Sequence, residues 1–310
     1  IGNRILDYET ASIKGIVSLS DNQHRYTLKN VTEETDVTIS INKTKTTKVT
    51  VAGVEIDAQT GAVKNGTLPK GVSYDPETIT LTLNNANIEY HSKSYVIDSD
   101  GELTVKVMGN NTITFQGWSG DYNGAISSWN LNITGIGTLN IIGKNGYSST
   151  GLWAGRRGLT IKETTVNISL EASKYGAEGL RGIWAQNGAS VVIDDGANVN
   201  IDVGDSKQST GISYGLNCYI NNSVVNVTVG KSDETQYYSG AILLGNTDDE
   251  NKDVRINGRQ CFPEGNIVKI TPDDFEFSPS EITVGSNILF QNWGSRYSQD
   301  RAVYDTYEYC

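Results

Sequence analysis

Histidine and cysteine, which build many catalytic and metal sites, are scarce in this chain. Its 310 residues include two histidines, His24 and His91, and three cysteines, Cys218, Cys261 and Cys310. Both histidines lie outside the repeat described below, which argues against histidine-based triads and multi-histidine metal sites. Three cysteines cannot form a disulfide framework. One bridge at most can exist, and a Cys261–Cys310 bond could close the C-terminal region.

Long apolar runs and clustered positive charges are also missing. No run approaches the roughly 18 residues of a membrane-spanning helix, so we do not expect membrane insertion. The net charge of −11 argues against nucleic acid as a partner, because phosphate binding requires clustered lysine and arginine. The acidity favours solubility, with cation binding by surface carboxylates as the alternative. The chain shows no signal-peptide pattern and starts at Ile1 without methionine, so we expect a processed or trimmed N-terminus.

The chain is instead rich in glycine, with 33 residues, and contains an internal repeat of about 29 residues. Each unit opens on a glycine followed by small or aliphatic residues: Gly124, Gly151, Gly182, Gly211 and Gly240. A second alternating segment follows at residues 131–134, 159–162, 191–194, 216–219 and 254–257. A third segment completes most units at residues 139–142, 166–169, 199–202 and 225–228. We expect each opening glycine to supply an unusual turn conformation.

Three short strands per repeat predict an all-β fold, a single-stranded right-handed parallel β-helix. Side chains alternate along a strand, so equivalent aliphatic residues of successive coils should stack inside. On this alignment Leu216 stacks with Val191, and Cys218 stacks with Ile193 as a buried, inert thiol. One outward position repeats asparagine, which predicts a stacked amide ladder, with a ligand-binding row as the alternative; its members are Asn140, Asn167, Asn200 and Asn226.

The ends of the chain depart from the repeat. We divide the sequence into an N-terminal β cap or lead-in (1–78), the parallel β-helix (79–257) and a C-terminal capping or docking segment (258–310). Solenoids need atypical elements that cover their exposed ends. The alternative for the terminal segments is self-association with neighbouring molecules.

Residues 48 to about 257 resemble a family of bacterial secreted or surface proteins labelled carbohydrate-binding domain-containing proteins, with a pectate-lyase-like β-helix. The resemblance rests on Val49-Thr-Val-Ala-Gly-Val-Glu-Ile, on Gly71-Val-Ser-Tyr-Asp-Pro-Glu-Thr-Ile-Thr-Leu, on Gly101-Glu-Leu-Thr-Val-Lys-Val and on the repeat itself. It implies an extracellular or cell-surface location, reached by removal of a signal peptide that this chain does not contain. It also implies binding of acidic polysaccharide, in some relatives with Ca²⁺.

β-Helices also include polysaccharide lyases and hydrolases, so catalytic groups could lie on the outer face of the coils. A lyase needs a base with carboxylate-bound calcium, and a hydrolase needs paired carboxylates on neighbouring coils. The outward positions carry Lys162, Asp194 and Asp202 but no recurrent carboxylate cluster. Asp194 and Asp195 are expected to form a turn. We therefore assign no catalytic residue, although a lyase or hydrolase is kept as the third option.

Aromatic residues provide the candidate binding site. Trp153 and Trp184 occupy the same repeat position one coil apart and should point outward, in a column that we align with Ile126, Ser213 and Ile242. Nearby loops and strands add Trp118, Tyr122, Tyr147, Tyr175, Tyr237 and Tyr238, together with Arg156, Arg157 and Arg181. Exposed indoles suit the apolar face of a pyranose, and arginine suits hydroxyls or a carboxylate.

Two alternatives to this site stay open: loops could cover the strip as a satellite core, or another chain could contact it. The leading functional expectation is a non-enzymatic, exported polysaccharide-binding protein, with Ca²⁺ as an optional cofactor. The second is a structural adhesin or filament subunit whose ends pair with neighbours.

Overall fold

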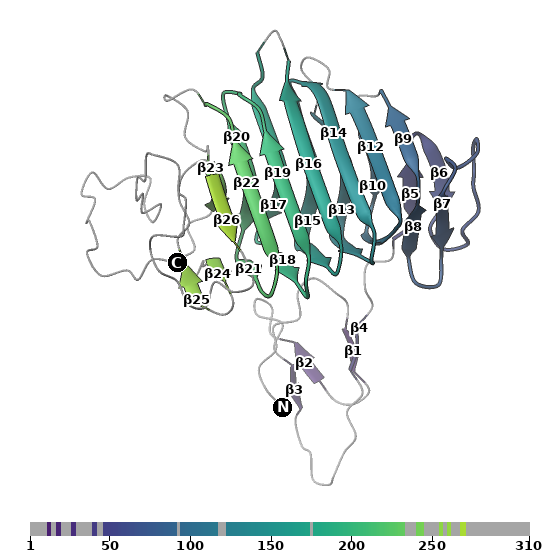
Figure 1. The fold of residues 1–310 in the computed structure, drawn as a ribbon. Coiled ribbons are helices and arrows are strands. Elements are labelled where there is room, and N and C mark those ends of the chain that lie inside the picture. Colours follow the sequence, from purple (N-terminus) through teal and green to yellow (C-terminus); the bar gives the residue numbers. More distant parts are fainter. Residues whose placement is uncertain are drawn as a thin grey trace. The chain divides into compact units, whose positions relative to one another are not determined.

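A computed structural model describes residues 11–13, 17–19, 26–28, 39–41 and 46–270, the last range without 92–93, 117–121, 174–175, 233–239, 245–253, 257–258 and 262–266. These residues form strands and no helix. The chain divides into two compact units, Ile1–Lys45 and Thr46–Cys310 (Figure 1). In the first unit β1 (Ala11–Ile13) pairs with β4 (Ile39–Ile41), and β2 (Val17–Leu19) pairs with β3 (Tyr26–Leu28), both antiparallel.

The second unit is a coil in which each turn contributes three strand segments. The first segments are β10 (Tyr95–Ser99), the starts of β13 (Tyr122–Thr134) and β15 (Ser148–Lys162), β17 (Gly179–Asn187), β20 (Ser209–Gly215) and β23 (Gly240–Leu244). The second segments are β8 (Thr80–Asn84), β11 (Glu102–Met108), the ends of β13 and β15, β18 (Val191–Asp194), β21 (Cys218–Ile220) and β24 (Val254–Ile256). The third segments are β9 (Asn87–Tyr90), β12 (Asn110–Gln116), β14 (Thr138–Gly146), β16 (Thr165–Ala172), β19 (Asn198–Val203) and β22 (Val224–Val229).

Equivalent segments of successive coils pair in parallel, and the third segments lie side by side across the front of Figure 1. The solenoid has about five turns at a spacing of roughly 28 residues, which confirms the predicted parallel β-helix. In β13 and β15 the first and second segments join into one continuous strand of 13 and 15 residues.

Antiparallel strands lie at both ends of the stack. At the N-terminal end β5 (Lys48–Val51) pairs with β10 and with β6 (Val54–Asp57), and β7 (Val72–Asp75) pairs with β8. At the other end β25 (Arg259–Cys261) pairs with β24, and β26 (Ile267–Ile270) pairs with β22. The predicted Cys261–Cys310 bond involves Cys310, which lies outside the described residues.

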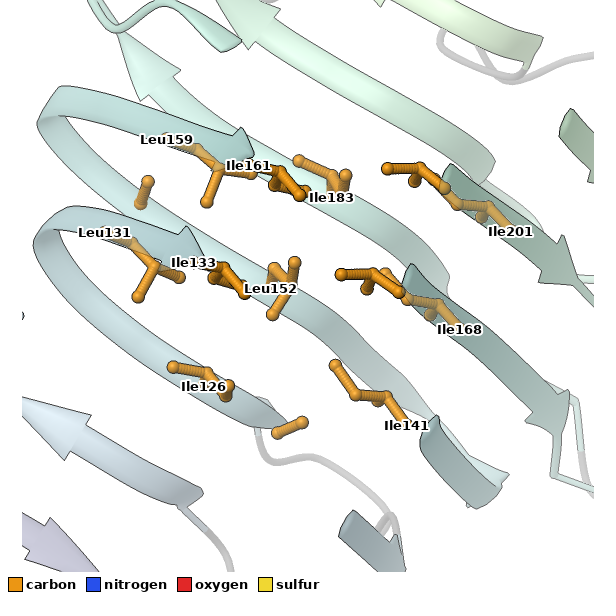
Figure 2. Close-up of a cluster of buried hydrophobic side chains, with 14 of the residues drawn as sticks. Ile126, Leu131, Ile133, Ile141, Leu152, Leu159, Ile161, Ile168, Ile183 and Ile201 are labelled. Atoms are coloured by element: carbon orange, nitrogen blue, oxygen red, sulfur yellow. The ribbon is translucent and has the colours of Figure 1, made fainter. Parts of the chain in front are cut away.

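Inward aliphatic side chains stack from coil to coil and form the core. Figure 2 shows Leu131 beside Leu159 and Ile133 beside Ile161, each pair one coil apart. The third segments contribute the facing stack of Ile141, Ile168 and Ile201. All of these side chains are almost fully buried. Since burying a large aliphatic side chain is worth about 1.5–3 kcal/mol, this repeated stack supplies most of the driving force for folding.

The predicted alignment of one strand was wrong by two residues. Cys218 pairs with Val191 rather than with Ile193, and Ile220 pairs with Ile193. Leu216 precedes the strand in a bend and is half-buried. Cys218 is nevertheless in the interior, as predicted, and burial raises the pKa of its thiol to about 12. The thiol is therefore protonated, and weakly nucleophilic, at neutral pH.

The asparagine ladder on the outward side of the third segments is confirmed. The amide Nδ2 of Asn226 donates to Oδ1 of Asn200 at 2.8 Å, and that of Asn200 donates to Asn167 at 2.8 Å. Asn167 donates to Asn140 at 2.9 Å, and Asn140 donates to Asn110 at 2.8 Å. Every bond points toward the N-terminal end of the stack, so the side-chain amides form one continuous chain across five coils.

Three of the five repeat glycines, Gly151, Gly182 and Gly211, have a different role from the one predicted. Gly182 and Gly211 do not adopt a left-handed backbone conformation. A Cβ atom at Gly182 would lie 2.5 Å from Cγ2 of Ile201, and one at Gly211 would lie 2.1 Å from Cγ1 of Val227. Gly151 is in the same situation. These positions are glycine because the first strands run too close to the third-strand core side chains for any larger residue.

Candidate functional site

Trp153 and Trp184 are direct neighbours on adjacent strands, as predicted. They pair in the register of β15 with β17, about 4.8 Å apart at the ordinary strand spacing. Each lies between residues that are almost fully buried, such as Leu152 and Ala154 on either side of Trp153. The two indoles are half-buried, which places them on the outward side of the strands.

The flanks of this column differ from the prediction. Ile126 and Ile242 point into the core, with 0% and 6% of their surface exposed. The alignment predicted from the repeat glycines is wrong by one residue at Gly124 and at Gly240. Gly124 pairs with Thr150 rather than with Gly151, and Gly240 pairs with Thr210 rather than with Gly211. A one-residue shift moves every side chain to the opposite face. The outward column is therefore Asp98, Ser127, Trp153, Trp184, Ser213 and Leu243.

Two further aromatic residues contact Trp153. The Tyr95 ring lies 6.5 Å from the Trp153 ring, centroid to centroid, with the planes tilted by 45°. The Trp129 ring lies 5.9 Å from it at 77°, an edge-to-face arrangement. Trp129 is 43% exposed, which is unusual for so large an apolar side chain. Tyr95, Trp129, Trp153 and Trp184 are called the aromatic cluster below.

Two glycines hold the outer rings of the cluster in place. A Cβ atom at Gly155 would lie 2.5 Å from Cε3 of Trp129, and one at Gly124 would lie 2.5 Å from Cε1 of Tyr95. Both rings therefore lie directly on the backbone of a neighbouring coil. This close approach fixes the rings before any ligand arrives, which lowers the entropy lost on binding.

Arg181 borders the cluster on one side. Its guanidinium lies over the Trp184 ring, 4.8 Å from the ring centroid, and its Nη2 donates to Oε1 of Gln208 at 3.2 Å. A cation over an indole face is stabilised by the ring quadrupole. Burial raises the pKa of Tyr95, while a hydrogen bond with Thr150 and the nearby Arg181 charge act in the opposite direction. The Tyr95 hydroxyl is therefore neutral at physiological pH.

Arg156 and Arg157 follow Gly155 in β15. Between Ala154 and Gly158, β15 has three residues where the paired stretch of β13 has only Trp129. The two arginines lie in this extra length and are exposed. The extra length thus places both arginines directly after Gly155, the residue against which the Trp129 ring packs.

The remaining predicted site residues are not shown to join the cluster. The Tyr147 hydroxyl donates to Oε1 of Glu178 at 3.2 Å, and Lys207 Nζ bonds to the same oxygen at 2.5 Å. The hydrogen bond from Lys207 lowers the pKa of Glu178, and the Lys207 charge acts in the same direction. Tyr147 therefore belongs to a polar group at the start of β15. Tyr122 begins β13, and its side chain is not described; outside the described residues lie Trp118, Tyr175, Tyr237 and Tyr238.

Within the described ranges, no group of three or more histidine, cysteine, aspartate or glutamate side chains could hold a metal ion. Asp195 lies in a turn with a left-handed φ of 53°, as predicted, and bonds to Lys162 Nζ at 2.8 Å. No helix that could span a membrane occurs in the part of the chain that the structure describes.

Comparisons with family models, curated protein sequences and solved structures find no match to this chain. The β-solenoid that the sequence resemblance implies is observed. Membership of the bacterial carbohydrate-binding family, and the extracellular location that it implies, stay predictions.

Proposed function

We propose that this protein is a non-catalytic carbohydrate-binding β-helix in which a sugar ring stacks on Trp129 and contacts Trp153. One observation carries the proposal: Trp129 is 43% exposed, yet Trp153 and the backbone at Gly155 hold its ring in place. A fixed, exposed indole is a good platform for the apolar face of a pyranose, because little side-chain entropy is lost when the sugar binds.

The surrounding cations supply the polar half of such a site. Of the four arginines between residues 46 and 256, three lie on β15 and β17, the strands that carry Trp153 and Trp184, although the chain as a whole is acidic. These are Arg156, Arg157 and Arg181. Guanidinium groups donate paired hydrogen bonds to vicinal hydroxyls or to a carboxylate.

The orientations of the ring planes favour a single soluble polysaccharide chain over a crystalline polysaccharide surface as the ligand. The tilts of 45° and 77° relative to Trp153 mean that Tyr95, Trp129 and Trp153 do not share one plane. A flat crystalline polysaccharide could stack on one of these rings only. A single chain, which can turn between successive units, can contact all three.

The experiment is a binding screen by isothermal titration calorimetry and affinity electrophoresis against neutral and acidic soluble polysaccharides, with CaCl₂ or with EDTA. We expect Trp129→Ala and Trp153→Ala each to weaken binding by about tenfold or more, equivalent to about 1.4 kcal/mol. The matched control is Tyr219→Ala, which removes a half-buried outward aromatic residue of β21, away from the cluster.

Three results would overturn the proposal. One is the absence of binding to every polysaccharide, and another is binding that all three variants retain unchanged. The third is release of unsaturated or reducing ends from a bound polysaccharide, which would make the protein a lyase or hydrolase. Loss of binding in EDTA that CaCl₂ restores would add calcium to the site.

A further inference from the structure

We propose that residues 66–71, called the strap below, close a strand edge at which a second copy of this chain pairs once the strap is displaced. The inference is independent of carbohydrate binding. The edge belongs to β9, the last strand of the seven-stranded sheet at its N-terminal end (Figure 1). The first and second segments at this end are covered by hydrogen-bonded antiparallel strands, β5 on β10 and β7 on β8. Among the described residues, β9 has no such strand.

The backbone groups of β9 that point away from β12 are unpaired within the described part of the chain. The N–H of Thr112 donates to the carbonyl oxygen of Ala86 at 2.9 Å, and Thr112 is the register partner of Asn87. Bonding directions alternate along a strand, so this pattern turns the N–H and C=O of Ile88 toward β12. The N–H and C=O groups of Asn87 and Glu89 therefore point outward. Such a row of unpaired groups is a template for another strand.

The strap lies across this edge from one end of β9 to the other. A Cβ atom at Gly71 would lie 3.1 Å from the backbone nitrogen of Ala86, directly before β9 begins. At the other end, a Cβ atom at Gly66 would lie 3.3 Å from a methyl group of the first β6 residue. The turn that precedes β6 contacts the hydroxyl of Tyr90, the last residue of β9. The strap therefore spans the length of the unpaired edge.

The strap is held by packing rather than by hydrogen bonds to β9. Leu68 is half-buried and packs against the hydrophobic core, while Thr67 and Lys70 are exposed. Pro69 has no N–H group to donate, and its carbonyl oxygen accepts from the N–H of Val72 at 3.1 Å. Covering an edge with a loop that contains proline prevents edge-to-edge pairing. Such a cover can be displaced, because no hydrogen bond between the strap and β9 has to break.

The β9 strand of a second copy fits this edge in an antiparallel, two-fold arrangement. Two such strands centred on Ile88 set each Asn87 opposite Glu89 of the other copy, and each such pair exchanges both of its N–H···O bonds. The side chains then pair an amide with a carboxylate, and no carboxylate opposes another. The same patch serves both copies, so the pairing closes at a dimer and does not continue into a filament.

The test measures molecular mass by sedimentation velocity and light scattering over a concentration series of the full chain. Wild-type protein should stay monomeric, whereas Leu68→Asp, which removes the packing of the strap, should form a dimer as the concentration rises. Lys70→Asp is the matched control, because it adds an acidic residue at an exposed position of the same strap and should stay monomeric. Combining Leu68→Asp with Glu89→Pro should restore the monomer, since proline removes an outward N–H and is tolerated at a strand edge.

Amide hydrogen exchange of the wild-type protein provides a second test, which stays decisive if Leu68→Asp does not fold. The amides of Asn87 and Glu89 should exchange much faster than those of Ile88 and Tyr90, which face β12. Equal protection of all of these amides would mean that the strap bonds to β9, and the inference would fall. It would also fall if Leu68→Asp stays monomeric at every concentration, or if Glu89→Pro leaves its association unchanged.

Discussion

Replacing Asn167 with alanine tests whether the asparagine ladder contributes to the stability of the solenoid. Asn167 lies in the middle of the ladder: its Nδ2 donates to Asn140 at 2.9 Å, and its Oδ1 accepts from Asn200 at 2.8 Å. Alanine removes both bonds and leaves the backbone pairing of β16 intact. Asn226 is the matched position at the end of the ladder, because its Nδ2 makes one ladder bond, to Asn200.

The magnitude follows from the number of bonds that each substitution removes. A neutral hydrogen bond contributes about 0.5–1.5 kcal/mol net. Asn167→Ala should therefore lower the free energy of unfolding by about 2 kcal/mol, and Asn226→Ala by about 1 kcal/mol. Asn167→Asp should cost at least as much as alanine at neutral pH, because it places a carboxylate oxygen against the Oδ1 of Asn140.

The assay is equilibrium urea unfolding followed by circular dichroism and tryptophan fluorescence. The two probes must give coincident transitions, since repeat proteins can lose cooperativity. Equal losses at Asn167 and Asn226 would refute the bond-counting argument. No loss at either position would mean that water replaces the ladder bonds without cost and that the ladder only fills a solvated face.

Gly182→Ala should destabilise the protein by about 1–3 kcal/mol, because the new Cβ would lie 2.5 Å from Ile201 and 2.7 Å from the carbonyl oxygen of Gly211; an unchanged urea midpoint would contradict the close approach of the two strands. Glu163→Asn should stabilise the protein by about 0.5–1 kcal/mol, because Glu163 is exposed and has a φ of 56°, where asparagine is less strained. Glu171→Asn, exposed on β16 with ordinary backbone geometry, should give no such gain in thermal melts.

The sequence predicts the coil architecture well because alternation is a strong local signal. Inward residues such as Leu131 and Ile133 recur in each unit, so the number of strands per coil and the inside of each strand can be read directly. The register of a single weak strand is different. A two-residue shift keeps every side chain on its side, so the alternation around Leu216, Cys218 and Ile220 fits two alignments equally well. A short bend at residues 216–217 precedes β21 and sets its alignment, and the periodicity of the sequence does not predict the length of that bend.

Trp129 is the central residue of the candidate site, and the alternation of the sequence does not predict its outward position. It stands two residues before Leu131, so simple alternation would turn its side chain inward. The chain instead bends within β13, where the pairing register with β15 changes between Ser128 and Asn130. Alternation holds only along an extended strand, and it carries no information across such a corner. A glycine in the next coil, Gly155, is the one sequence feature compatible with a large ring lying over it.

The asparagine ladder and Trp129 differ in the free energy that a ligand could gain by binding to them. In the third segments the ladder amides bond to one another from Asn226 to Asn110, so much of their hydrogen-bonding capacity is used within the protein. A ligand on that face would have to compete with bonds already made. Trp129 instead keeps apolar surface in water, and burying such surface under a sugar releases free energy in proportion to its area. The asparagine ladder therefore favours stability, and the exposed Trp129 ring, held where β15 is longer than its neighbour, suits the binding that we propose.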